Sequence, residues 1–107
     1  MPVFQITKGD YQIMSSIFKI ENNTRYEITW FEFVKVMTHL GYAYSPGGHK
    51  GKGKTSGSRC RFISKRDGSV VNFHTPHNKK LEQYKQDDLK WALERTLGWS
   101  KSSFIIA

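Results

Sequence analysis

Two arginines and two histidines that lie close together in the sequence could transfer protons beside a phosphate. Arg59 and Arg61 alternate along one predicted strand, and His74 and His77 lie at the end of the next strand and just beyond it. Histidine can take or give a proton because its ordinary pKa lies near neutral pH. Arginine stays charged and binds phosphate through a planar set of donors. These residues predict acid–base chemistry on a phosphate-bearing substrate.

The distribution of charge favours a polyanionic partner. The chain carries 17 basic and 9 acidic side chains, a net charge of +8. Residues 33–66, the acid-free window, contain eight basic and no acidic side chains. Such a window is typical of a surface that meets nucleic-acid phosphates, and a solvated basic loop would give the same pattern. Further candidates for phosphate contact are Lys50, Lys52, Lys54, Lys79 and Lys80.

Two other motifs predict chemistry only weakly. The segment 51–55, Gly-Lys-Gly-Lys-Thr, resembles a nucleotide-binding loop, but it lacks the first glycine and a strand replaces the helix that should follow. His74 and His77 with Cys60 could suggest zinc, but the strand register turns Cys60 toward the core. We therefore expect no metal and no cofactor, and we interpret Cys60 as a packing residue.

Length and composition predict one folded domain in the cytoplasm. A chain of 107 residues with 37% hydrophobic and 14% aromatic content can build one packed core. One cysteine cannot form an internal disulfide, and the start Met1-Pro2-Val3-Phe4 does not resemble a secretory signal. No apolar run approaches the ~20 residues of a membrane span, so we expect no membrane partner.

Local signals predict three helices. Apolar residues at helical spacing predict one helix over about 10–20. Thr29 and Glu32 form a capping-box pattern before a second helix over about 30–40, which Gly41 ends. Asp87 and Asp88 are predicted to open a third helix, where acidic side chains suit the helix dipole, and Gly98 ends it.

A hairpin is predicted to position the candidate site. Residues 42–44, 59–63 and 69–74 are predicted strands, and Asp67-Gly68 supplies turn chemistry between the last two. This hairpin pairs Arg59 with His74 and Arg61 with Asn72 on a polar face. The opposite face carries the pairs Ser64 with Ser69, Phe62 with Val71, and Cys60 with Phe73.

The element order predicts an α+β fold. A helix, three strands and a helix follow an additional first helix. The chain divides into an N-terminal helical extension (1–28), a core (29–98) and a C-terminal tail (99–107). The apolar end of the tail could pack on the domain, on a second copy or on a partner.

Four segments carry a resemblance to a known family. They are Trp30–Val34 running into Leu40–Tyr42, then Gly57–Arg59, then Thr75–Lys80, then a leucine-bearing helix ending at Gly98. In this order, over residues 29–98, the chain resembles the HicA toxins of bacterial type II toxin–antitoxin pairs. The resemblance implies a fold like the double-stranded-RNA-binding domain, with a three-stranded antiparallel sheet packed on two helices. It also implies a metal-independent ribonuclease that cleaves mRNA and is inhibited by a HicB-type antitoxin.

The chain departs from the family at one position. The family's Gly-Ser-His motif becomes Gly-Ser-Arg here, so Arg59 replaces the expected catalytic histidine. We hypothesise that His74, across the hairpin, takes the role of that histidine while Arg59 holds the phosphate. His77, the second histidine of the family pattern, could orient substrate or transfer the second proton. The alternative is an RNA-binding module of the same fold without catalysis. A purely protein-binding domain would leave the acid-free window unexplained.

Overall fold

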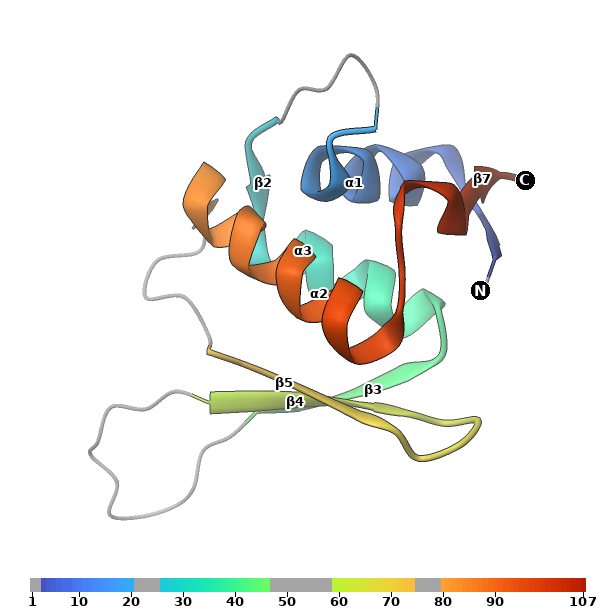
Figure 1. Cartoon of the computed structure of the whole chain (residues 1–107), viewed down its shortest axis with the longest axis vertical. Coiled ribbons are helices and arrows are strands. Elements are labelled where there is room, and N and C mark those ends of the chain that lie inside the picture. The colour runs from blue at the N-terminus through green and yellow to red at the C-terminus, as the bar shows by residue number, and fades with distance from the viewer. Residues whose placement is uncertain (1–2, 21–25, 47–58, 75–79) are drawn as a thin grey trace.

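The computed structural model describes residues 3–20, 26–46, 59–74 and 80–107 (Figure 1). Within these ranges the chain forms three α-helices and a three-stranded antiparallel sheet, which confirms the predicted α+β class. The elements are β1 (Phe4–Ile6), α1 (Lys8–Phe18), β2 (Ile28–Thr29), α2 (Trp30–His39), β3 (Tyr42–Pro46), β4 (Arg59–Ser64), β5 (Val70–His74), β6 (Lys80–Leu81), α3 (Gln83–Leu97), the 3-10 helix η2 (Lys101–Ser103) and β7 (Phe104–Ile106).

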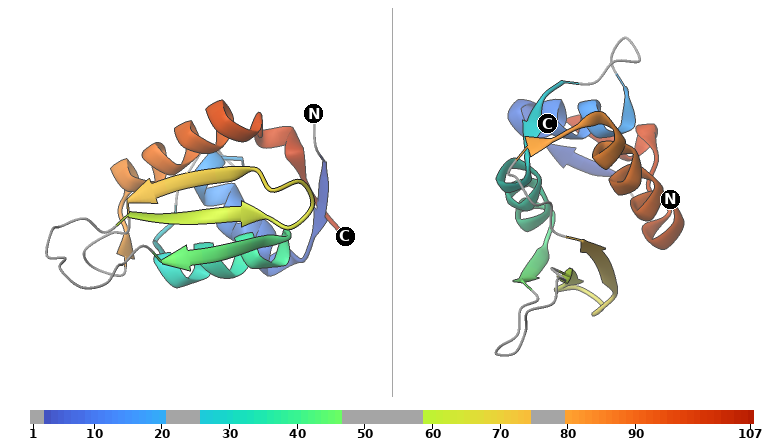
Figure 2. Two further views of the ribbon diagram at one scale, coloured as in Figure 1. Left: turned by 90° about the horizontal axis from the view of Figure 1, so that it is seen from below. Right: turned by 90° about the vertical axis from the view of Figure 1, so that its left-hand side faces the viewer.

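The elements lie in layers. The main sheet has the strand order β3-β4-β5, and α2 and α3 cover one of its faces (Figures 1 and 2). Helix α1 packs against α2 and α3 on the side away from the sheet. The other face of the sheet carries no described element. None of the helices in the described ranges is both long and apolar enough to cross a membrane.

The capping signals in the sequence define α2 as predicted. The Glu32 amide donates to Thr29 Oγ1 at 3.2 Å, and the Thr29 amide donates to Glu32 Oε1 at 2.8 Å, so the capping box is complete. After the helix, Gly41 adopts a φ of +96°, a left-handed conformation that favours glycine. These two ends place Trp30 and Phe33 on the side of the helix that meets the sheet.

The hairpin register is confirmed residue by residue. Arg59 pairs with His74 and Arg61 with Asn72, while the Ser64 amide donates to the Ser69 carbonyl at 2.8 Å. Asp67 fixes the turn because its Oδ1 accepts from both the amide and the hydroxyl of Ser69, at 3.0 and 2.8 Å. The register follows from packing, since a slip of one residue would turn the buried side chains of β4 and β5 toward water.

An aromatic cluster joins α2 to the sheet. Its members are Trp30, Phe33, Phe62 and Phe73, all buried, with ring centroids 5.4 to 6.4 Å apart. Several pairs meet edge to face, the arrangement that aromatic quadrupoles favour. The cluster therefore fixes the position of α2 over β4 and β5.

The start of the third helix differs from the prediction. Helix α3 begins at Gln83, with Glu82 as its N-cap, so Asp87 and Asp88 lie in the second turn and no acidic residue occupies the first. The apolar stripe misled the prediction because the inward-facing residue of the first turns is Gln86, a polar side chain that is 1% exposed. The predicted end at Gly98 is confirmed, with a φ of +71°.

The buried side chain of Gln86 forms hydrogen bonds with three other segments of the chain. Its Nε2 donates to the carbonyls of Leu81 and Tyr26, at 2.9 and 3.0 Å, and its Oε1 accepts from the Ser16 hydroxyl at 2.6 Å. Ser16 Oγ in turn accepts from the Tyr26 amide at 2.8 Å. This polar network ties α3 to α1 and to the segment before β2.

The two chain ends pack on each other. Strand β1 pairs in parallel with β7, and Trp99 and Phe104 are both 3% exposed. Phe4 contacts both rings, with centroids 5.1 Å and 5.9 Å away. The apolar end of the tail was expected to pack on the domain, on a second copy or on a partner. In the structure it packs on the domain.

We expect Gln86→Ala to lower the free energy of unfolding by about 3 kcal/mol, because Ser16, Tyr26 and Leu81 each lose a hydrogen bond to the buried amide. Urea unfolding measures this change. The matched control is Gln12→Ala, an exposed glutamine of α1, which should change stability by no more than about 0.5 kcal/mol. Equal effects of the two substitutions would contradict a structural role for Gln86.

The Asp67 turn between β4 and β5 predicts that the stability of the hairpin falls at acid pH. The hydrogen bonds from Ser69 hold the pKa of Asp67 below its ordinary value of 3.8. Because the pKa of Asp67 is lower in the folded chain, its ionised carboxylate stabilises the hairpin at pH values above the ordinary pKa. This stabilisation is lost as the pH falls through the lowered pKa of the folded chain. Carboxyl-carbon NMR titration should show the low pKa, and Ser69→Ala should move it back toward 3.8. An ordinary pKa in the wild-type chain would rule this out.

Candidate functional site

One face of the sheet is covered by none of the described elements, and we call it the uncovered face; it presents polar side chains. Arg61, Asn72 and His74 are exposed there, while their neighbours Cys60, Phe62 and Phe73 are buried on the helix side. Directly opposite residues in an antiparallel pair have Cβ atoms about 4.5–5.5 Å apart, and diagonal ones about 7–8 Å. The register therefore brings together the backbone positions of Arg59 and His74 and places Arg61 diagonally next to His74.

His74 has a rigid support although its ring is exposed. It is the last residue of β5 and directly follows Phe73, which packs against Phe33 and Phe62 at centroid distances of 5.7 and 5.6 Å. A side chain carried by a strand with such packing keeps its place without losing access to solvent. That combination suits a group that exchanges protons with a bound substrate.

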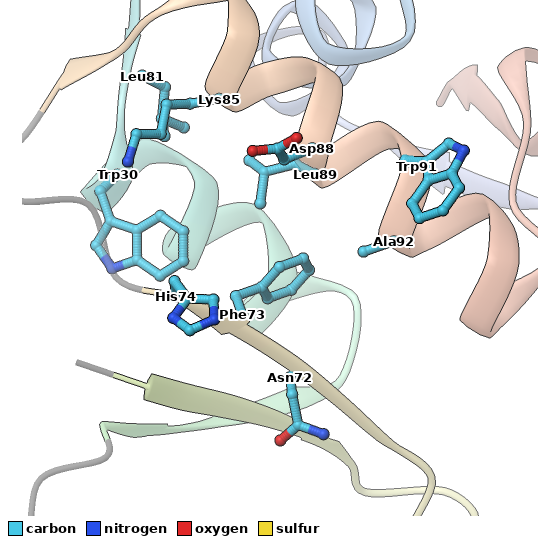
Figure 3. Close-up of a pocket in the computed structure, with 10 residues that line it drawn as sticks. All are labelled: Trp30, Asn72, Phe73, His74, Leu81, Lys85, Asp88, Leu89, Trp91 and Ala92. Carbon is cyan, nitrogen blue, oxygen red and sulfur yellow. The ribbon is translucent and has the colours of Figure 1, made fainter. Parts of the chain in front are cut away.

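A pocket of about 280 Å³ opens beside His74, between the free edge of β5 and helix α3 (Figure 3). Phe73 extends from β5 toward α3, whereas the Asn72 side chain points to the other side of the strand. We call this space the β5–α3 pocket. Its lining residues are Trp30, Asn72, Phe73, His74, Leu81, Lys85, Asp88, Leu89, Trp91 and Ala92.

The pocket combines an apolar interior with polar groups at its rim. Phe73 and Leu89 are buried, and Ala92 is partly buried. Lys85 and Asp88 add one positive and one negative side chain from α3. Sites for small organic ligands share this character, mostly apolar with a few polar groups that fix orientation.

Trp91 is an unusual member of this lining. It is 60% exposed, and the Arg95 guanidinium lies 4.3 Å from the centroid of its ring. A cation over an indole face at this distance is attracted by the ring quadrupole. The contact limits the ring's freedom while much of its surface stays open.

The sequence-predicted residues divide into three groups. Arg61 and His74 lie on one face of the sheet, as expected. Lys80 lies on β6 and pairs with Glu27, with Nζ 3.0 Å from Oε2, and the hydrogen bond and charge of Glu27 raise the pKa of Lys80. The third group lies outside the described residues and comprises Lys50, Lys52, Lys54, His77, Lys79 and the side chain of Arg59.

We find no match to this chain among family models, curated proteins or solved structures.

Cys60 takes the place predicted for it. It is fully buried, and its Sγ lies 3.6 Å from the Phe73 carbonyl, on the opposite side of the sheet from the His74 ring. Across the described ranges, no three His, Cys, Asp or Glu side chains lie close enough to hold a metal ion.

Helix α3 contributes residues to the pocket that the sequence did not predict as site residues. Lys85 and Trp91 lie outside the helix's apolar stripe, and Asp88 was predicted only to open the helix. One signal was present: Trp91 falls off the stripe of Leu89 and Leu93, so a large aromatic had to lie on the polar side of an amphipathic helix. What the sequence could not indicate is that this side of α3 meets the edge of β5.

Proposed function

We propose that this chain is the toxin of a toxin–antitoxin pair, a metal-independent endoribonuclease that cleaves mRNA. The observation that carries the proposal is the backbone pair Arg59–His74. It sets an imidazole directly across from the position where the HicA pattern has its histidine. The order α2-β3-β4-β5-β6-α3, in which the short strand β6 lies outside the main sheet, supports the proposal of a fold like the double-stranded-RNA-binding domain.

The proposed chemistry needs no metal. The ribose O2′ attacks the adjacent phosphorus and loses its proton to His74. The bond from phosphorus to O5′ breaks, and O5′ takes a proton from a second group, a role we assign to His77 from its place in the sequence. The products end in a 2′,3′-cyclic phosphate and a 5′-hydroxyl. Arg59, to which we assign this role from its register opposite His74, holds the phosphate and stabilises the charge that develops on the phosphoryl oxygens, and Arg61 adds a second cation on the same face.

The proposal includes a HicB-type antitoxin as inhibitor. An inhibitor of such an enzyme must keep RNA phosphates from the imidazole and the neighbouring cation. We therefore expect it to cover Arg59, His74 and His77. His74 is exposed on the uncovered face of the sheet, and Arg61 is exposed on the same face.

One observation favours a second candidate function, an RNA-binding module without catalysis. Arginine stands at position 59, where the family pattern has its catalytic histidine. A guanidinium stays protonated and cannot serve as a general base at neutral pH. The two functions share RNA affinity and differ in turnover.

We expect His74→Ala to lower kcat/KM for cleavage of a labelled mixed-sequence RNA by roughly 10²- to 10⁴-fold, the usual contribution of a general acid or base. The assay contains a metal chelator, and gels report product size. Arg59→Ala and His77→Ala are assayed beside it. Full cleavage by His74→Ala would show that the imidazole has no catalytic role.

His39→Ala is the matched histidine control. Trp30 is the first residue of α2 and His39 the last, so they are about 13 Å apart along the helix axis. His39 Nδ1 lies 2.8 Å from Asp10 Oδ2. It should keep wild-type cleavage where the protein is folded. RNA binding without any cleavage by the wild-type chain would favour the RNA-binding module.

Arg61→Ala should weaken RNA binding and lower the slope of log affinity against log salt by about one, the loss of one phosphate contact. The ligand is 2′-O-methyl RNA, whose blocked O2′ cannot attack. Lys65→Ala removes an exposed cation from the β4–β5 turn and is the control. Identical slopes for the two variants would place Arg61 on a merely solvated surface.

A further inference from the structure

We infer that the β5–α3 pocket holds one unstacked base of single-stranded RNA and prefers bases that carry an exocyclic amino group. This inference rests on the proposed function, because it names the substrate class of the same site. The observations behind it are the shape of the pocket, the exposed indole of Trp91, the carboxylate of Asp88 and the position of His74 at the rim (Figure 3).

The pocket suits a small planar ligand. Its volume of about 280 Å³ lies just below the range of about 300–1,000 Å³ that is typical of ligand sites, so it suits a ligand no larger than a single base. Phe73 and Leu89 form the apolar floor of the pocket, and Trp30 and Trp91 lie at its two ends. An unstacked base has an apolar π-face that gains from such surroundings and a polar edge that needs partners.

Trp91 is placed to act as a stacking surface. Trp91 lines the pocket and is 60% exposed as a residue, and the Arg95 guanidinium lies 4.3 Å from the centroid of its ring, which restrains the ring. Stacking on an aromatic side chain is the main way proteins hold unpaired bases. Because the ring is already restrained, less side-chain entropy is lost when a base stacks on it.

Asp88 supplies the preference among bases. A carboxylate only accepts hydrogen bonds, so it favours the base edge that offers more N–H donors. The exocyclic amino group of adenine, cytosine or guanine supplies two N–H donors, whereas the edge of uracil offers only its N3–H. Lys85, one turn earlier on α3, adds a cation to the pocket. Its positive charge attracts the RNA phosphates.

The surroundings favour single-stranded RNA over a duplex. In a duplex the base faces are stacked and the edges are paired, so no base is available for a pocket. A base seated in the β5–α3 pocket lies beside His74, with its own ribose and phosphate at the rim. Trp91 is therefore a positioning residue that brings the adjacent O2′ to the imidazole.

The test measures the affinity of the full chain for labelled single-stranded 2′-O-methyl oligomers of about ten nucleotides. Oligo-A, oligo-C, oligo-U and a mixed-sequence duplex are compared by fluorescence anisotropy. We expect oligo-A and oligo-C to bind more tightly than oligo-U and the duplex. Trp91→Ala should weaken oligo-A binding roughly 5- to 150-fold, the range of one lost stacking contact.

Helix α3 offers matched controls. Tyr84 is also a 60% exposed aromatic but does not line the pocket, so Tyr84→Ala should keep wild-type affinity. Asp88→Ala should remove the preference for oligo-C over oligo-U, while Asp87→Ala keeps it. Ala92→Phe fills the pocket and should act like Trp91→Ala, and thermal unfolding verifies that each variant is folded.

Three results would overturn the inference. The first is equal RNA affinity of Trp91→Ala and Tyr84→Ala, and the second is a preference of the wild-type chain for the duplex. The third is a Trp91→Ala chain that keeps its RNA affinity but escapes inhibition by the antitoxin. That result would make the pocket a protein interface, for example one where an extended peptide pairs with the edge of β5.

The blocked O2′ separates this inference from the proposed function. Base-selective binding that depends on Trp91, with no cleavage of ordinary RNA, refutes the ribonuclease and leaves the base pocket standing. Cleavage that requires His74 but ignores Trp91 and base identity refutes the pocket and leaves the ribonuclease standing.

Discussion

The packing of Phe73 into the aromatic cluster determines where the candidate site lies. Phe73 contacts Trp30, Phe33 and Phe62 on the helix side of the sheet, so β5 cannot slide or turn without exposing a large aromatic ring. The next residue, His74, must then project on the uncovered side, at the same level as Arg59. One buried ring thus fixes the register, the face and the end of the strand at which proton transfer is proposed.

A second constraint, polar rather than aromatic, places α3. Gln86 bonds Ser16, Tyr26 and Leu81, and this anchors the first turns of the helix against α1 and β6. Farther along, Leu89 and Leu93 pack inward. The helix therefore passes along the edge of β5 without pairing with it, and the space left between them is the β5–α3 pocket. Stability in the interior and an opening at the surface come from the same placement.

The sequence predicted the parts of the fold that local rules determine. The capping box of Thr29 and the alternation of β4 and β5 are short-range patterns, so α2 and the hairpin were predicted accurately. The start of α3 was wrong because a buried polar residue, Gln86, interrupts the apolar stripe. The pairs β1–β7 and β2–β6 were missed because they are two or three residues long and join distant segments. The pocket was missed for a similar reason, since it exists only where α3 crosses β5.

Under the proposed function, the arginine at position 59, where the HicA pattern has a histidine, has a physical consequence. Strand β4 is the central strand of the sheet, whereas β5 is an edge strand that borders the pocket. On β5, His74 lies both on the exposed face to which we propose that phosphates bind and at the rim of the pocket that we propose holds a base. The two proposals together would link proton transfer to base recognition, because the strand end that carries the imidazole also forms the wall against which the base would lie.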